Sequence, residues 1–321
     1  MAKLTNTKTS NLIKTIIYGP PKTGKTHLAG SLAEEFNVLW FDLENGIDTL
    51  RDSLPPHLQE KINVISVRDT TSQRVALETV LTFLRGRNPA PLKICTTHGK
   101  INCPICSKSQ DYSYDEVDIN ALGLDTVVVI DSLTQLTASA VAAIGARINT
   151  DPGNKNVSIE DELDYLKKFG FDEWELLRKI FTEVGTLIQA APVHILCITH
   201  EQEVTMEDGT KKLVPVMGSS SFAASCCKYF GDVVYCYIKM KSYLAQSTVD
   251  GSSQVTAGSR TGLDLSKLKD KQLTLSPSYK SKFSSLPREI SNGNSQTTHQ
   301  QTNAQPGRTA TGVLSGFRRP T

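Results

Sequence analysis

The sequence predicts an α/β fold in which helices cover a mostly parallel central sheet. Apolar, β-branched runs typical of strands alternate along the chain with amphipathic segments typical of helices. A glycine-rich Gly-x-x-x-x-Gly-Lys-Thr segment, residues 19–26, joins the first predicted strand to the first predicted helix. Because ligands of such sheets bind at the carboxyl ends of the strands, we expect the functional residues to follow strands.

The pattern of apolar residues predicts the individual elements up to residue 240. The predicted strands are Lys14–Tyr18, Val38–Phe41, Asn63–Val67, Thr126–Ile130, His194–Thr199 and Asp232–Lys239. The predicted helices are Thr26–Phe36, Ser72–Leu84, Leu133–Arg147, Ile159–Lys168 and Glu173–Ala190. Asp172 and Glu175 have the spacing of a capping box at the start of the last helix. Asp208–Gly209, between two alternating runs, predicts a β-hairpin.

Composition limits the classes of protein to consider. The net charge of the 321 residues is +2, so any nucleic-acid surface must be local rather than a global excess of charge. The sequence has no run of eighteen apolar residues and no secretory pattern at its start, so we expect a cytoplasmic protein without a membrane partner. Seven cysteines in that setting favour metal binding or buried thiols over disulfides.

The glycine-rich segment has the composition of a phosphate-binding loop. Gly19 and Gly24 let the backbone approach phosphate oxygens, and Lys25 supplies a positive charge for the β- and γ-phosphates. The Thr26 hydroxyl and Asp131, which ends a buried strand, are expected to hold Mg²⁺. The cofactors expected are ATP and Mg²⁺. The nucleotide site is predicted to comprise Gly19, Pro20, Pro21, Lys22, Thr23, Gly24, Lys25, Thr26, His27 and Asp131.

Two further polar residues follow predicted strands. Glu44 stands two residues after Asp42, at the end of the second strand, and His200 directly follows the fifth. Here the chain resembles the RecA-like ATPases, in which a glutamate after such a strand activates the attacking water and a polar sensor follows a later strand. The resemblance implies that Glu44 is the catalytic base and that His200 and Lys25 complete the catalytic group. The alternatives are a loop capped by both carboxylates and a histidine without a role.

The order of the motifs from residue 12 to residue 265 narrows this resemblance. Gly-Pro-Pro-x-Thr-Gly-Lys-Thr, Trp-Phe-Asp-x-Glu, Ile-Thr-His-Glu and Phe-Gly-Asp-Val-Val look like phage-encoded RecA-like proteins, which include the Sak-type single-strand annealing ATPases. The resemblance implies a RecA-like fold and a DNA-stimulated ATPase that acts on single-stranded DNA in recombination. It also implies a homo-oligomer with ATP at its subunit interfaces. Related motor or loader ATPases, and a slow nucleotide-gated scaffold, remain alternatives.

The same resemblance assigns lysines and an arginine of the second half of the chain. Lys211 and Lys212 would face DNA, while Lys239, Lys241 and Arg260 would reach a neighbouring subunit's nucleotide. Any one of these charges could instead be an ordinary solvated side chain. The sequence departs from the family pattern in two places. Lys22 stands where members of the resembled family usually have glycine. Gly-Ser precedes Arg260 where those proteins often have Lys-Asp.

A cysteine cluster predicts a zinc site. Cys95, His98, Cys103 and Cys106 have the spacing Cys-x₂-His-x₄-Cys-x₂-Cys, which can close a tetrahedral shell around Zn²⁺. We expect residues 93–112 to be a structural insertion without a strand or helix of its own, and free surface thiols are the alternative. The other cysteines, expected to be buried small apolar residues, are Cys197, Cys226, Cys227 and Cys236.

The end of the chain differs in composition from the rest. Residues 1–275 are predicted to form the ATPase core and residues 276–321 a disordered tail rich in Ser, Thr, Gln, Asn, Gly and Pro. Gly312–Pro320 regains apolar and basic residues, as a short docking motif would, although an inert end is the alternative. A single-strand-binding protein is one partner expected for the tail.

Overall fold

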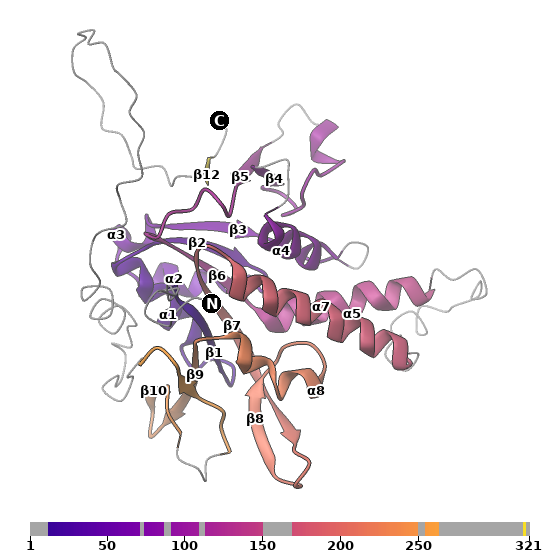
Figure 1. Cartoon of the computed structure of the whole chain (residues 1–321). Helices are drawn as coiled ribbons and strands as arrows, with labels where there is room; N and C mark the ends of the chain where they lie inside the picture. Colours follow the sequence, from indigo (N-terminus) through magenta and orange to yellow (C-terminus); the bar gives the residue numbers. More distant parts are fainter. Residues whose placement is uncertain are drawn as a thin grey trace, which may run out of the picture.

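The computed structural model describes residues 12–70, 74–86, 91–108, 113–149, 169–249 and 254–262, together with the strand Phe317–Arg318 (Figure 1). The predicted helix Ile159–Lys168 lies outside the described residues, as does the predicted tail apart from that strand. No helix in the described part of the chain is long and apolar enough to cross a membrane.

All six predicted strands form, and they lie side by side as the parallel core of one sheet. The spatial order is β9-β1-β7-β6-β2-β3. Their bounds are β1 Lys14–Gly19, β2 Asn37–Asp42, β3 Ile62–Ser66, β6 Thr126–Asp131, β7 His194–Thr205 and β9 Asp232–Lys239. This is the mostly parallel α/β arrangement that the sequence predicted.

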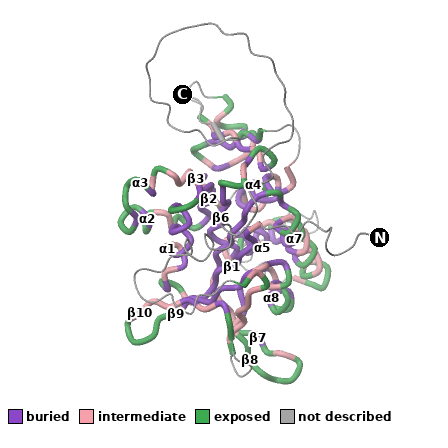
Figure 2. The backbone as a smooth tube through the Cα atoms, turned by 60° about the vertical axis from the view of Figure 1, so that its left-hand side comes forward, coloured by how far each residue is buried: buried purple, intermediate pink, exposed green. Residues whose placement is uncertain are grey.

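Three antiparallel strands extend this sheet. β10 Ser242–Gln246 and β11 Gly258–Ser259 pair with β9, and β8 Lys211–Pro215 pairs with the end of β7. The predicted hairpin at Asp208–Gly209 is therefore confirmed, with Gly209 at φ 79°. β7 is longer than expected because it continues past the sheet into this hairpin, which projects from the body of the molecule in Figures 1 and 2.

Helices cover both faces of the sheet. One face packs against α4 Val75–Arg85, α5 Leu133–Asn149 and α7 Phe171–Ala190, and the other against α1 Lys25–Gly30, α2 Asp48–Ser53 and α3 Pro56–Gln59 (Figure 1). The remaining short helices are α8 Ser220–Ala223 and the 3₁₀ turns Ser31–Glu34, Cys106–Lys108 and Cys226–Tyr229. Alternation along β1 explains the two layers, because Ile16 and Tyr18 join the first core while Ile17 joins the second.

The helices differ from the prediction in several places, and α1 ends at Gly30 rather than at Phe36. α7 begins at Phe171, and the carboxylate of Glu173 accepts a hydrogen bond from the Gly170 backbone N–H at 2.7 Å. Glu175 instead pairs with Arg178, so the capping role predicted for Asp172 and Glu175 is wrong. α2 and α3 follow β2 and had no clear periodic signal, because each is under two turns long.

A small second sheet is built by β4 Leu92–Cys95 and β5 Tyr114–Val117, with β12 Phe317–Arg318 at its edge. The cysteine segment was expected to lack strands, so this sheet corrects the prediction. Both strands are only four residues long, and their alternation was too short to recognise.

Candidate functional site

The glycine-rich loop connects β1 to α1 at the carboxyl edge of the sheet, and its two glycines are required by its backbone. Gly19 has φ 147°, and a Cβ there would lie 2.1 Å from the Cys236 carbonyl oxygen of β9. Gly24 has φ 83° and faces the Tyr243 ring. Lys22 has φ 64°, a left-handed conformation that costs a non-glycine residue roughly 1–2 kcal/mol.

Lys25 is held inside the loop that it is predicted to serve. It is 6% exposed, and its Nζ donates hydrogen bonds to the carbonyl oxygens of Gly19 at 2.9 Å and Pro20 at 2.6 Å. Burial lowers the pKa of Lys25, although nearby carboxylates oppose that shift. The ammonium group therefore lies where the loop closes, at the place where a phosphate group would enter.

The Mg²⁺ pair predicted from sequence comes together. The Thr26 Oγ1 donates to Asp131 Oδ2 at 3.4 Å, from the start of α1 to the end of β6. Burial, followed by repulsion from Glu44 and Asp42, raises the pKa of the Asp131 carboxyl to about 7. A buried oxygen cluster that resists carrying its own negative charge is chemically suited to a hard divalent cation, so the residues present fit Mg²⁺.

The two carboxylates that follow β2 have different roles. Asp42 is 1% exposed, and its Oδ1 accepts a hydrogen bond from the Gly46 backbone N–H at 3.0 Å, which closes the loop. Glu44 points into the site instead. One of its oxygens accepts a hydrogen bond from the Ser132 hydroxyl, and the other lies 3.7 Å from His200 Nε2. The loop-capping alternative thus describes Asp42 but not Glu44.

His200 connects the site to the β7–β8 hairpin. Its backbone N–H donates to the Thr134 hydroxyl at 2.9 Å, and its carbonyl accepts from the Val216 N–H at 2.9 Å. Thr199, beside it, donates to the Val216 carbonyl at 2.7 Å. His200 Nδ1 is buried without a hydrogen-bond partner in the described structure. A movement of His200 would therefore act on Val216, at the base of the hairpin, through these backbone hydrogen bonds.

These side chains line a cavity of about 750 Å³. Sequence reasoning missed several of its walls, of which Tyr243 on β10 has the largest side chain. Tyr243 lies far along the chain from the glycine-rich loop and comes close only because β10 folds back beside β9. The other unpredicted lining residues are Thr49, Asp52, Ser53, Ser132, Ile198 and Thr199.

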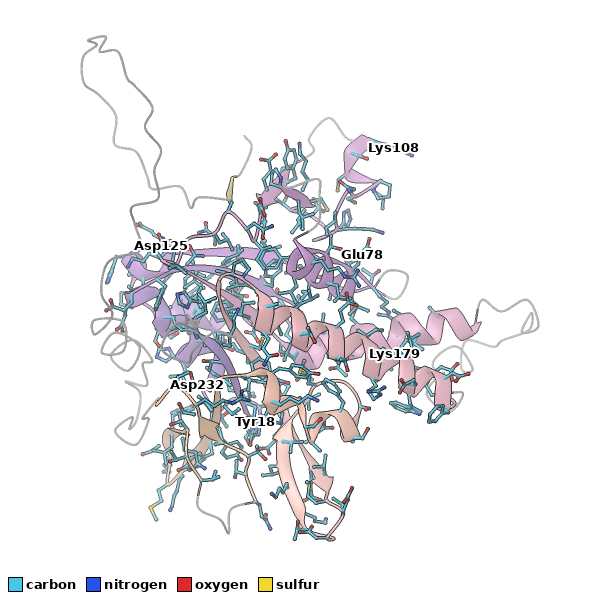
Figure 3. The ribbon with its side chains drawn as sticks, viewed as in Figure 1. Tyr18, Glu78, Lys108, Asp125, Lys179 and Asp232 are labelled. Atoms are coloured by element: carbon cyan, nitrogen blue, oxygen red, sulfur yellow. The ribbon has the colours of Figure 1, made fainter. Side chains whose placement is uncertain are left out.

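The residues predicted to contact DNA lie on the hairpin, away from the cavity. Lys211 and Lys212 are exposed at the start of β8, and Lys211 Nζ forms an ion pair with Glu203 at 2.7 Å. The hairpin from residue 201 to 215 carries four acidic side chains and two lysines. Tyr18, labelled in Figure 3, contacts the hairpin at β8: its hydroxyl lies 3.1 Å from the Leu213 carbonyl oxygen and 2.6 Å from that of Thr256, both of which can accept its hydrogen bond.

The three residues predicted to act on a neighbour's nucleotide are divided between opposite ends of β9. Lys239 and Lys241 flank the exposed β9–β10 turn, where Met240 is 90% exposed. Arg260 follows Ser259, which pairs with Asp232 at the beginning of β9, and its guanidinium donates to the Lys228 carbonyl at 2.8 Å. Seven residues of strand, roughly 23 Å, separate the two positions, so one phosphate group cannot meet both.

The cysteine cluster has the geometry of a metal site. The ligand atoms of Cys95, His98, Cys103 and Cys106 all lie within 4.8 Å of one another. His98 Nδ1 faces the three sulfur atoms at 3.8 Å from Cys95, 3.6 Å from Cys103 and 3.2 Å from Cys106. Three thiols and one imidazole converging in this way are the donor set of a closed structural Zn²⁺ site, with no position left for water.

Backbone contacts prepare this cluster and attach it to the core. Burial would raise the pKa of the Cys103 thiol, but hydrogen bonds from the Cys106 and Ile105 backbone outweigh it and lower that pKa to about 6. Gly99, with φ 62°, packs so closely on the end of β3 that a Cβ would lie 2.5 Å from the Ser66 carbonyl oxygen. Of the remaining cysteines, Cys197, Cys226 and Cys236 are buried as expected, and Cys227 is half-buried.

The fold and the site together define a P-loop nucleotide-binding protein. A protein-family model described as an AAA domain matches residues 11–261. The chain belongs to this AAA domain family and is a P-loop NTPase of the AAA type. No curated protein matches it. The crystal structure of the RadB recombinase aligns at 13% identity with a TM-score of 0.35, over 74% of this chain and 80% of that one. A TM-score this low supports no inference about this chain.

Proposed function

We propose that this protein hydrolyses ATP to ADP and phosphate and uses the nucleotide cycle to act on single-stranded DNA, in recombination or annealing of the phage type. The observation that carries the proposal is the placement of Glu44. It points into the cavity that Lys25, Thr26 and Asp131 also line, from a strand separate from those that position the other three. A phosphate-binding loop by itself explains only the binding of a nucleotide. A carboxylate on the opposite side of the cavity also supplies a general base for its hydrolysis.

The residues divide the chemistry between them. Lys25 leaves its two carbonyl partners and neutralises charge on the β- and γ-phosphates. Thr26 and Asp131 would hold Mg²⁺, which would supply further positive charge for the phosphate groups. Glu44 accepts a proton from the attacking water, and Ser132 and His200 fix the orientation of its carboxylate.

His200 is the residue through which we propose that the nucleotide state reaches DNA. Its imidazole lies beside Glu44, while its backbone lies at the start of the hairpin that carries Lys211 and Lys212. A new hydrogen bond between the imidazole and the γ-phosphate would break the contact with Glu44 and pull on that hairpin. His200→Ala should therefore abolish the stimulation of hydrolysis by DNA, in addition to lowering the basal rate through the lost contact with Glu44.

ATP is proposed to lie between neighbouring subunits of a homo-oligomer. Support comes from the β9–β10 turn, where Lys239, Met240 and Lys241 are exposed at the same edge of the sheet as the glycine-rich loop. An apolar side chain 90% exposed between two lysines is suited to a contact with another subunit. Zn²⁺ at the cysteine cluster is proposed as a structural metal, and the tail as the contact for a single-strand-binding protein.

The test is the ATPase rate with and without single-stranded DNA, measured beside an annealing assay on the same preparation. Stimulation by single strands together with annealing supports the proposal. Hydrolysis that DNA leaves unchanged contradicts the DNA part and favours a nucleotide-gated scaffold. The hairpin carries more carboxylates than lysines, which disfavours contact with DNA phosphates. This observation is the reason to retain the nucleotide-gated scaffold as a second candidate function.

A further inference from the structure

The small sheet beside the cysteine cluster is too short to be stable by itself. β4 and β5 have four residues each, and a two-stranded ribbon in water is marginal even when it is longer. β5 also presents an edge, and an unpaired edge strand readily recruits another extended segment. In the structure this edge is occupied by β12, which is antiparallel to β5 and comes from the far end of the chain.

The register of the three strands forms two rows of different character. One row consists of Leu92, Val117 and Phe317, and the first two of these are buried and apolar. The next row consists of Lys93, Glu116 and Arg318, and Lys93 already forms an ion pair with Glu116 at 3.5 Å. An aromatic residue therefore continues the apolar row, and an arginine continues the charged row.

This match is specific to one register. Side chains alternate between the faces of a strand, so a slip by one residue would place Phe317 opposite a carboxylate, either Asp118 or Glu116, in place of Val117. The charge balance favours the same pairing. Residues 115–118 of the module read Asp-Glu-Val-Asp, whereas residues 312–321 contain two arginines and no acidic residue. The end of the chain is thus complementary in both polarity and charge to the edge that it occupies.

We propose that the C-terminal segment around Phe317 and Arg318 is the resident ligand of the metal-binding module and completes its sheet in the same chain. It covers the β5 edge and returns the tail to the module, so that any other extended segment must displace it first. The pairing gives a function to a tail end whose composition suggested either a docking motif or an inert terminus. It does not depend on ATP hydrolysis or on DNA.

The experiment is hydrogen exchange measured by mass spectrometry on the full-length, zinc-loaded protein. Phe317→Pro removes the backbone N–H of a residue of β12 and fixes its φ, whereas Val313→Pro makes the same substitution elsewhere in the terminal segment. Phe317→Pro should speed exchange of the β5 amides that face β12 by about tenfold or more. The β4 amides and the Val313→Pro variant should exchange as the wild type does.

A charge reversal tests the register. Glu116→Lys places a positive charge opposite Arg318 and should loosen the same amides, and adding Arg318→Glu should restore protection. Protection that is unchanged in Phe317→Pro, or a reversal that fails to rescue, overturns the proposal. Exchange rates that fall as protein concentration rises would also overturn it, because the strand would then come from a second copy.

Discussion

At the scale of single residues, the site is built from buried ionisable groups whose pKa values depend on burial and on neighbouring charges. Asp131 is 3% exposed, and burial, followed by repulsion from Glu44 and Asp42, raises the pKa of its carboxyl. Lys25 is the nearby cation, and its ammonium is bound to carbonyl oxygens of its own loop. Nucleotide and Mg²⁺ together would satisfy both groups.

Removal of the Lys25 charge should abolish nucleotide binding without unfolding the chain. In Lys25→Ala the loop loses its contact with the β- and γ-phosphates, while the apolar core on either side of β1 is untouched. Fluorescent ATP titration and thermal melting should show loss of binding with an unchanged melting temperature. Lys61→Ala, at a half-buried lysine that does not line the cavity, is the control and should bind normally. Normal turnover by Lys25→Ala would disprove the role of the loop.

The free energy of unfolding should decrease as the pH is lowered, because a buried histidine, His194, must stay neutral in the folded chain. The His194 ring accepts a hydrogen bond from the Ile13 N–H at 2.8 Å and donates one to the Leu124 carbonyl at 3.0 Å, so it must be neutral. Burial lowers its pKa from 6.5 to about 4. The unfolded chain therefore takes up a proton that the folded chain refuses, and stability present above pH 6.5 is lost as the pH falls toward 4.

The lowered pKa of His194 corresponds to a loss of about 3 kcal/mol in the free energy of unfolding when the pH falls below 4. Urea titrations at a series of pH values would measure it. His194→Gln should lower stability at neutral pH but flatten its dependence on pH across this range, while His57→Gln, at an exposed position, should leave the curve as it is. An unchanged slope in His194→Gln would place the titration elsewhere.

At the scale of elements, the structure explains which predictions succeeded. Strands such as Thr126–Asp131 are continuous apolar runs buried on both faces, and sequence periodicity finds them reliably. Asp42 and Glu44 could be located beside β2, but only the fold separates them, because the Gly46 N–H selects one carboxylate. Tyr243 and Ser132 carry no local signal, since their place in the cavity depends on strand order. Strands as short as β4, with four residues, are too short for an alternation of apolar and polar residues to identify them in the sequence.

The metal-binding segment should depend on its four ligands rather than on apolar contacts. Cys103→Ser should lose about one Zn²⁺ per chain and loosen residues 93–112, because metal binding supplies much of the folding energy of so small a module. Elemental analysis and limited proteolysis measure the two effects. Cys227→Ser, outside the cluster, should keep its zinc. Anaerobically purified wild type without zinc would refute the site.

The hairpin lysines should control the salt dependence of DNA binding. Neutralising Lys211 and Lys212 together should reduce the slope of log K against log salt by about 1.4 units, at about 0.7 per phosphate contact on a single strand. The pairing of Lys211 with Glu203 would make the observed change smaller than this maximum. Fluorescence anisotropy over a salt series measures it, with Lys61 and Lys179 neutralised as the control. An unchanged slope would exclude the hairpin from the DNA contact.

At the scale of the whole molecule, the sheet order explains how separate segments of sequence form one site. β1, β7, β6 and β2 lie side by side, so the loops that follow them meet at a single edge although they are far apart in the chain. Lys25 and Glu44 follow β1 and β2, while Asp131 ends β6 and His200 lies within β7. The AAA domain match covers this whole region, whereas the C-terminal strand lies outside it and joins the metal-binding module instead.

The central claim is that Glu44 is the base of an ATPase, and Glu44→Gln tests it most directly. Lys25, Thr26 and Asp131 remain in this variant, so ATP and Mg²⁺ should bind with unchanged affinity. Hydrolysis should fall by about 10²–10⁴-fold, the usual contribution of a general base. Glu201→Gln is the control, because Glu201 accepts a hydrogen bond from Tyr235 at 2.9 Å and does not line the cavity. Wild-type turnover by Glu44→Gln, with loss of turnover in Glu201→Gln, would contradict the claim.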